Sequence, residues 1–553
     1  MPAWLDVAVL AVLGGVLPLT IAARFGALSI PRNDAWSYVL ATYRLADHGR
    51  LYGNGFVGKA LVGQLFGSVP TVWIFGHSIT ALHVEVALVG VVGLLAVHDL
   101  ARHFVPPRTA LFVAAATAAL PLWLCLSATF MTDVPMCSLA LVSLALGARA
   151  VRADDLRVGW FIGSLAVGVV AVSVREYALV APVAVCLGAL WAATGWERRR
   201  RAAALIGLAG VIVATVVVMA WVRSLPGWAM NSPALPTTSD LTKGWHFTTR
   251  SGVLVGLLVL PGVVFAGPLR LVRSAWERSR VVSGAVGVVV AGALLVEIAQ
   301  QRSSVYLLGP GNDVLTNGVG STGTIHGVYR PDLFPHLLLR LAALVGVAST
   351  TVMVVALVPA VLGLGRRVRD HRFGPPVPPA LAIVVLATLG FVVSPPASVP
   401  FGLSSFDRYF LPALPLITLL VVRAGRERAS GPRPHRHDRA GAWSVAGWVV
   451  GAGLLVFGVV LAANSASFDA AKWEVADRAA SVVGGVDRVD GGFEWSDWHA
   501  GRQVFIGPAG LPALDRCVIL QVSPGPAGHG VAAKRVWTPR GSVWVVARRV
   551  GSC

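Results

Sequence analysis

Charged residues are scarce in this sequence, at 13% of 553 residues, whereas hydrophobic residues make up 55%. The mean hydropathy of +0.71 excludes a soluble globular chain of this length. Apolar runs long enough to cross a bilayer recur along the chain, which predicts an all-α polytopic membrane protein. The first run, from Leu5 to Ala23, lacks the basic start and the cleavage pattern of a secretory signal, so we expect a retained span.

Cysteine is also rare, and none of the five has the spacing of a zinc or redox site. Cys125, Cys137 and Cys186 lie in or beside apolar runs and are expected to be small buried residues. Cys517 and Cys553 lie in a segment that we place outside the cytoplasm, where a disulfide persists, but the sequence leaves their pairing open. No combination of His, Asp and Cys has metal-ligand spacing, which predicts no metal.

The net charge of +19 comes without a basic face interleaved with aromatic residues, so we expect no nucleic acid partner. The arginines gather instead in alternate short connections, and the positive-inside rule makes those connections cytoplasmic. They are 102–108, 149–157, 198–201, 270–280, 366–372 and 423–439.

About 13 spans are predicted at a need of about 20 residues each. They fall at 4–23, 79–100, 108–127, 133–150, 158–174, 176–194, 202–222, 251–271, 281–299, 336–363, 379–396, 409–423 and 442–463, with a further half-buried segment at 61–75. The longer connections, 24–78, 223–250, 300–335 and 396–408, are then extracytoplasmic, with the N-terminus inside. We expect a bacterial cytoplasmic membrane protein.

The chain changes character after residue 463. Tryptophans lie among Gly, Asp and Arg, and the runs RCVILQV and GSVWVVARRV alternate as strands do. This predicts two domains: a membrane domain, 1–463, and a small extracytoplasmic domain, 464–553, of α/β or mostly β structure. Within VDGGFEWSDWH, Trp495 is either a sugar-stacking residue or part of a packed core.

Two acidic motifs, Asn33-Asp34 and Thr132-Asp133, lie where predicted spans meet water on the outer side. A carboxylate so close to hydrocarbon is costly outside a polar cavity or a helix cap, so each is a candidate site residue. The alternative for both is an N-cap, because each precedes a predicted helix.

Two arginines occupy the same outer edge. Arg175, next to Glu176, either anchors a tight turn through a local ion pair or offers its donors to a phosphate. Arg408, next to Tyr409, either binds a phosphate or extends to the interface.

Together these motifs resemble the GT-C membrane glycosyltransferases. The shared features are an acidic residue in a long first outer loop, Thr132-Asp133-x-Pro135, an outer arginine before the sixth span, and RYFLPALP beginning a late span. The resemblance covers residues 1–425. Within the family, the chain most resembles the branch of protein O-mannosyltransferases and lipid A aminoarabinose transferases. Those mannosyltransferases carry an Asp-Glu pair where this chain has Asp34-Ala35, a difference that weakens the case for a protein acceptor.

The resemblance implies an inverting transferase that moves a sugar from a polyprenyl-phosphate carrier to an acceptor hydroxyl, with no cofactor. It implies Asp34 as the general base and Asp133 as a catalytic residue that positions the sugar or the acceptor. Candidate phosphate ligands are Arg175, Arg408 and Lys59; candidate sugar or acceptor contacts are Asn33, Glu176, Tyr409 and Trp495. The partners would be membrane lipids, the lipid-linked donor, and a glycan, lipid or protein acceptor.

Two other functions stay open: a transporter or flippase of a lipid-linked envelope intermediate, and a non-catalytic scaffold. Transporters show internal repeats and polar residues near mid-membrane, whereas this chain keeps its charges at the outer rim. A scaffold would tolerate neutralising Asp34 and Asp133 together.

Overall fold

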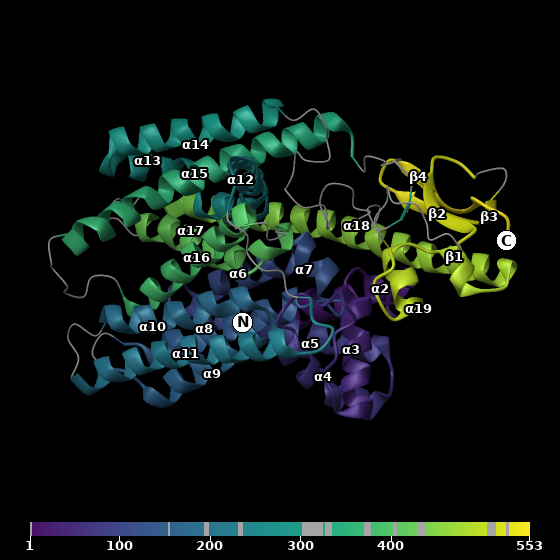
Figure 1. The fold of residues 1–553 in the computed structure, drawn as a ribbon. Coiled ribbons are helices and arrows are strands. Elements are labelled where there is room, and N and C mark those ends of the chain that lie inside the picture. Colours follow the sequence, from purple (N-terminus) through teal and green to yellow (C-terminus); the bar gives the residue numbers. More distant parts are fainter. Residues whose placement is uncertain are drawn as a thin grey trace.

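The molecule is described here by a computed structural model covering residues 3–152, 155–192, 198–229, 236–300, 325–326, 334–369, 378–401, 406–429, 437–505, 516–526 and 530–553. The described residues are mostly helical, and a small sheet forms near the C-terminus. Figure 1 shows a long bundle of helices with this sheet at one end. The predicted helical membrane protein with a small C-terminal sheet is confirmed.

Each predicted span corresponds to one helix or to successive helices. In chain order they are α1 (Ala3–Ala11), the π-turn Val12–Val16 and α2 (Leu17–Arg24); α5 (Ile79–Arg102); α6 (Pro107–Ala118) and α7 (Pro121–Leu126); α8 (Asp133–Ala150); α9 (Val158–Val174); η2 (Glu176–Leu179) and α10 (Val180–Ala192); α11 (Arg198–Ser224); α12 (Thr238–Ala266); α14 (Arg280–Gln300); α15 (His336–Arg369); α16 (Pro379–Ser398); α17 (Ala413–Ala429); and α18 (His437–Val483). Within the described ranges, nine helices are long and apolar enough to cross a membrane, and three shorter apolar helices accompany them.

One span begins earlier than predicted. The sequence places the eighth span at 251, but α12 starts at Thr238. Thr237 and Asp240 form a capping box there, in which each side chain accepts a hydrogen bond from the backbone N–H of the other. This box satisfies donors at the helix start, and so the helix extends out of the apolar run.

The remaining helices are short and lie between or beyond the spans. They are α3 (Ala35–His48), α4 (Val62–Phe75), α13 (Pro268–Arg278), η6 (Val399–Phe401), η7 (Asp407–Phe410), η9 (Val486–Arg488) and α19 (Phe493–Ala500). Helix α3 is followed by its C-cap residue Gly49, whose φ of 63° is the left-handed conformation that glycine adopts without a steric penalty. The segment 61–75, predicted to be half-buried, forms α4.

The C-terminal sheet has the strand order β1-β2-β4-β3, with strands at Val489–Asp490, Val518–Ser523, Gly530–Thr538 and Gly541–Arg549. Strands β1 and β2 are parallel, and the other neighbours are antiparallel. Cys517 and Cys553 form a disulfide that ties the start of β2 to the chain end. Helix α18 continues through residue 463 and meets the sheet, where Asn464 Nδ2 donates to the Trp537 carbonyl at 2.7 Å. The division into domains at 463 stays a prediction.

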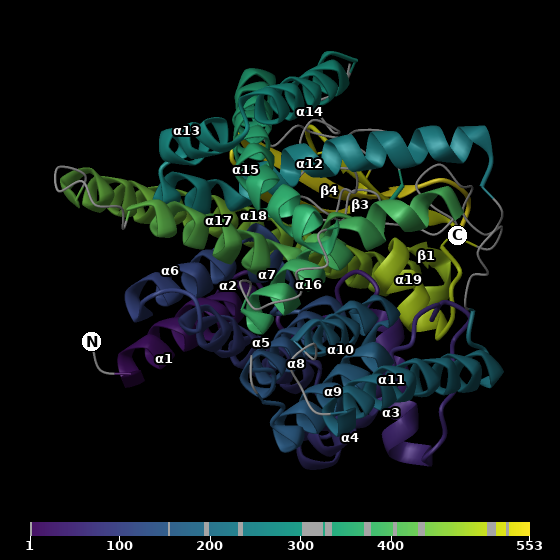
Figure 2. The same ribbon diagram turned by 90° about the vertical axis from the view of Figure 1, so that its left-hand side faces the viewer.

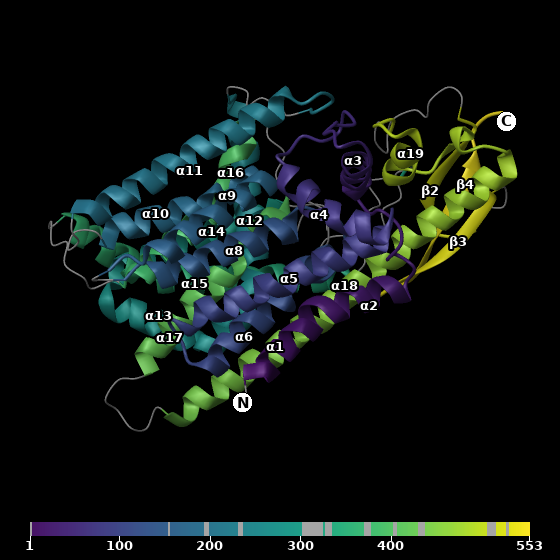
Figure 3. The same cartoon turned by 90° about the horizontal axis from the view of Figure 1, so that it is seen from below.

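The bundle has two distinct ends. Arg149, near the end of α8, pairs with Asp99 of α5, and Arg426 of α17 donates to Thr109 of α6. These arginine-rich ends share one side with the N-terminus, whereas α3, α19 and the sheet lie at the other, as Figures 2 and 3 show. Between them α8 is enclosed, with 78% of its apolar window buried, against 17% for α11.

Candidate functional site

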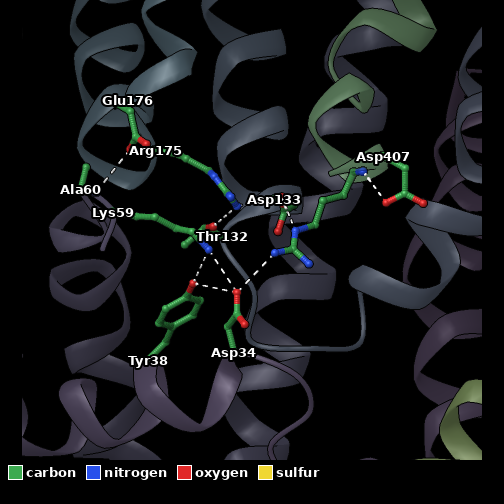
Figure 4. Close-up of polar contacts among 10 residues, drawn as sticks. Asp34, Tyr38, Lys59, Ala60, Thr132, Asp133, Arg175, Glu176 and Asp407 are labelled. Atoms are coloured by element: carbon green, nitrogen blue, oxygen red, sulfur yellow. Dashed lines mark hydrogen bonds and ion pairs between the residues drawn. The ribbon is translucent and has the colours of Figure 1, made fainter. Parts of the chain in front are cut away.

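Asp34 occupies the N-cap position of α3, but its side chain makes no capping hydrogen bond. Three donors reach its Oδ2 instead: Lys59 Nζ at 3.1 Å, Arg408 Nη2 at 3.3 Å and Tyr38 Oη at 3.4 Å. Figure 4 shows Asp34, Tyr38 and Lys59 turned toward one another. The carboxylate is therefore directed into an ionic cluster rather than onto the helix backbone.

Asp133, in the first turn of α8, is also directed toward cationic side chains. Thr132 is the N-cap, and it too makes no side-chain cap. Asp133 Oδ1 accepts from Arg175 Nη1 at 2.8 Å and lies 3.5 Å from Arg408 Nε. Its Oδ2 is buried without a hydrogen-bond partner among the described residues. For both acidic motifs, then, the carboxylate binds cations and leaves the helix start uncapped.

Arg175 lies where α9 ends and the backbone becomes extended, at φ −158° and ψ 128°. Its Nη1 donates to Thr132 Oγ1 at 2.7 Å as well as to Asp133. The guanidinium also lies over the ring of Tyr409, 4.4 Å from its centroid. Arg175 is thus bound across the bundle, whereas the alternative from the sequence was a local pair at the turn.

Arg408 lies in η7, immediately before α17, and joins the two carboxylates. It reaches Asp34 through Nη2 and Asp133 through Nε, although 374 residues separate it from Asp34. Its side chain is 2% exposed. A buried arginine held by two carboxylates does not extend to the interface, as the alternative from the sequence required.

Lys59 lies in the connection between α3 and α4, which the segment after α11 holds in place. Trp228 Nε1 donates to the Lys59 carbonyl at 2.8 Å, and Gly53 N donates to the Pro226 carbonyl. Gly53 and Gly227 approach so closely that a Cβ on Gly53 would lie 2.2 Å from the Gly227 carbonyl oxygen. Glycine at both positions lets the two segments approach each other. Their contact positions Lys59 beside Asp34.

Glu176 supports the same connection from the opposite side. Its Oε2 accepts from Ala60 N at 3.4 Å, next to Lys59 (Figure 4). Glu176 therefore contacts the backbone beside the cluster.

We call Asp34, Lys59, Asp133, Arg175 and Arg408 the site cluster. All five are predicted site residues, and the structure brings them together from separate parts of the chain. Sequence reasoning missed Tyr38, whose hydroxyl accepts from Lys59 Nζ at 2.9 Å. Its position one helical turn after Asp34 is the signal that would have found it.

Burial and the neighbouring charges determine the protonation of Asp34 and Tyr38. Burial alone would raise the pKa of Asp34, but the charges of Lys59 and Arg408 outweigh it and hold that pKa below the usual value. Burial raises the pKa of Tyr38 to about 12. At neutral pH Asp34 is a carboxylate and Tyr38 is a neutral phenol.

Asn33 and Trp495, which the sequence predicts to contact the sugar or the acceptor, have no side-chain contact with the site cluster in the described residues. Asn33 contributes its backbone N–H, which donates to Glu494 of α19 at 3.0 Å. Trp495 lies in α19 with no exposed surface, and its Nε1 donates to Asp477. A ring so enclosed has no face for a sugar, which fits the packed-core interpretation of Trp495 that the sequence left open.

No group of three or more His, Cys, Asp or Glu residues in the described ranges has the geometry to hold a metal ion. The expectation that the protein needs neither metal nor cofactor stays a prediction.

Residues 70–221 match the model of the family described as Dolichyl-phosphate-mannose-protein mannosyltransferase. The predicted resemblance to GT-C glycosyltransferases is confirmed. The matched stretch contains Asp133 and Arg175, while Asp34, Lys59 and Arg408 lie outside it. No protein of curated function matches this sequence.

Several solved structures show a distant likeness. ArnT from Cupriavidus metallidurans bound to undecaprenyl phosphate is 14% identical with a TM-score of 0.43, over 96% of this chain and 97% of ArnT. The oligosaccharyltransferase AglB from Archaeoglobus fulgidus is 14% identical with a TM-score of 0.39, over 85% of this chain and 58% of AglB. The arabinosyltransferase EmbB from Mycobacterium smegmatis is 12% identical with a TM-score of 0.32, over 95% of this chain and 44% of EmbB. At this distance none of the three assigns a role to a residue of this chain.

Proposed function

We propose that this protein is an inverting glycosyltransferase that moves a sugar from a polyprenyl-phosphate carrier to an acceptor hydroxyl at the outer face of the bacterial cytoplasmic membrane. One observation carries the proposal: the carboxylates and cations that this chemistry needs meet in a single buried cluster. The acceptor would be a glycan, lipid or protein of the cell envelope.

The cations of the site cluster suit a phosphate. Three cationic side chains meet two carboxylates there. The forked donors of arginine match phosphate oxygens, and fixed cations stabilise the charge that develops on a departing phosphate. Arg175, Arg408 and Lys59 would bind the donor phosphate in this way.

Asp34 is suited to the role of general base. Its contacts with Lys59, Arg408 and Tyr38 all reach Oδ2, and no described residue donates to Oδ1. Oδ1 would take the proton of the acceptor hydroxyl while the hydroxyl oxygen bonds to the anomeric carbon. The bond from that carbon to the phosphate oxygen breaks with its electron pair, so the carrier phosphate leaves as an anion. A single displacement of this kind inverts the configuration at the anomeric carbon.

Asp133 suits a different role. Its Oδ1 is held by Arg175, and its buried Oδ2 has no partner among the described residues. A buried carboxylate oxygen strongly favours a hydrogen bond, and a sugar or acceptor hydroxyl would supply one. Tyr409, stacked on Arg175, would border the same space.

The distribution of charge supports the proposed outer location. The arginine-rich ends of α8 and α17 lie opposite the end that carries the site cluster. The positive-inside rule assigns the arginine-rich end to the cytoplasm.

The test is turnover of purified protein with a panel of radiolabelled polyprenyl-phosphate sugars and membrane extract. We expect release of the lipid phosphate with one or more donors, and no release by Asp34→Asn. The matched control is Asp47→Asn, which changes an exposed carboxylate on the same helix that pairs with His77. Full turnover by Asp34→Asn would refute the proposal, and transport of the lipid without release of its phosphate would favour a flippase.

A further inference from the structure

The turn that leads into α3 has an unusual backbone. Ala35 N donates to the Arg32 carbonyl at 3.1 Å, which closes a turn over Asn33 and Asp34. Asn33 has φ 54°, a left-handed conformation that asparagine adopts more often than most residues but less readily than glycine. Such a conformation persists only where the surroundings hold it in place.

The C-terminal part of the chain holds this turn at two points. Arg32 donates to Asp469 Oδ2 at 2.7 Å and to Ser465 Oγ at 2.8 Å, both on α18. The Asn33 N–H donates to Glu494 Oε1 on α19. Figure 3 shows α19 beside α3 at the end of the molecule that carries the sheet.

Glu494 is itself fixed. Its other oxygen, Oε2, accepts from Lys472, which also lies 3.8 Å from Asp469. Glu494 and Lys472 have no exposed surface. We call Arg32, Asp469, Lys472 and Glu494 the turn network. Because each carboxylate of the network pairs with a cation, the acceptor for Asn33 N–H has a single fixed position.

The turn determines where Asp34 points. The Asp34 side chain makes no capping hydrogen bond with the backbone of its own helix, and so the backbone at Asn33 and Asp34 sets its direction toward Lys59 and Arg408. Without an acceptor, the partly buried Asn33 N–H would be unpaired, and we expect the backbone to relax to negative φ. That rotation would carry Asp34 away from the cations.

We propose that Glu494 is a positioning residue, which holds the left-handed turn at Asn33 and thereby sets Asp34 in the site cluster. This inference rests on the proposed function of Asp34. It makes the segment after residue 463 part of the transfer machinery, although that segment supplies no group to the reaction.

The test measures kcat and the KM for the donor in Glu494→Ala, alone and combined with Asn33→Gly. Since a displacement of about 1 Å can cost about 100-fold in rate, we expect kcat to fall on that order with KM unchanged. Glycine adopts positive φ without a penalty, so Asn33→Gly should restore most of kcat in the double variant. A merely structural role would not produce this rescue.

The matched control is Asp497→Ala. Asp497 lies on the same helix and accepts from Val504 N and Phe505 N, away from the turn. We expect its kcat to match the wild type at temperatures where it is folded. Equal losses in Glu494→Ala and Asp497→Ala, or no rescue by Asn33→Gly, would overturn the inference.

Asn33→Val keeps the test informative if Glu494→Ala does not fold. A β-branched residue disfavours positive φ while Glu494 stays intact, so kcat should fall. Wild-type kcat in Asn33→Val would contradict the inference. Asp34→Asn separates the two claims: its inactivity beside a fully active Asn33→Val refutes only the role of the turn, whereas its full activity refutes the proposed function.

Discussion

The site cluster and the turn network are two buried ionic groups at the same end of the molecule, and they differ in how fully they are paired. In the turn network two cations meet two carboxylates, and both oxygens of Glu494 accept hydrogen bonds. In the site cluster three cations meet two carboxylates, and Asp133 Oδ2 and Asp34 Oδ1 accept none from described residues.

The difference separates a structural role from a chemical one. A buried ionic group with every oxygen satisfied fixes geometry, because any displacement breaks several bonds together. A buried group that leaves oxygens unpaired is costly, and a bound ligand is one way to offset that cost. The pairing pattern thus favours the site cluster for ligand binding and the turn network for support.

The largest expected effect is on the carboxylate that holds both arginines. Asp133→Ala leaves Arg175 and Arg408 without that partner, so we expect a loss of about 3–5 kcal/mol in unfolding free energy and no transfer. Chemical unfolding in detergent measures the loss. The control is Asp99→Ala, whose pair with Arg149 is partly exposed and is worth about 1 kcal/mol or less. Equal losses in the two variants would contradict the burial argument.

The disulfide should affect stability without affecting transfer. Cys517 and Cys553 are 36 residues apart, and closing a loop of that length stabilises by about 4 kcal/mol in the chain-entropy account. Cys517→Ser with Cys553→Ser should lower the melting temperature, while turnover below the transition stays at the wild-type rate. Lost turnover in a folded variant would show that the strand ends contact the site.

Replacing one arginine of the site cluster should weaken donor binding. Arg175→Lys keeps the charge but loses the fork that reaches Thr132 and Asp133, so we expect the donor KM to rise about 10-fold. Arg149→Lys, at the opposite end of α8, serves as the control and should leave the KM unchanged. A KM unaffected by Arg175→Lys would place the donor phosphate elsewhere.

The smallest effect concerns pH and the C-terminal segment. Burial raises the pKa of Asp497 to about 7 from its ordinary 3.8, although the N–H groups of Val504 and Phe505 act to lower it. Because the folded pKa is raised, its stabilising contribution is complete below pH 3.8 and is lost as the pH rises through about 7. The melting temperature should therefore fall between pH 5 and pH 8, and Asp497→Asn should flatten that change. An unchanged slope in the variant would assign the pH dependence to another group.

The sequence predicts much of the membrane region, because apolar length and arginine placement are local properties. It identifies the side on which Asp34, Asp133, Arg175 and Arg408 lie, since each follows or precedes a span at the same end. It does not predict which groups pair, because Arg408 meets Asp34 only after helices far apart in the chain have packed.

Other features depend on tertiary contacts that leave no local pattern. Lys59 reaches the site cluster because Gly53 and Gly227 let two connections meet. Trp495, in a segment rich in polar residues, is buried because α19 packs against α3 and β1, and its indole bonds to Asp477 of α18. The role of Asn33 lies in its backbone, which a side-chain motif does not reveal.

The most direct test of the account is a single-turnover measurement with the lipid-linked donor that the panel identifies. Donor affinity and the rate of lipid-phosphate release are measured in the wild type and in Asp34→Asn. The account predicts unchanged donor affinity, because Arg175, Arg408 and Lys59 remain, with release slowed by about 100-fold to 10,000-fold through loss of the base. Release at the wild-type rate from a folded Asp34→Asn protein would contradict it.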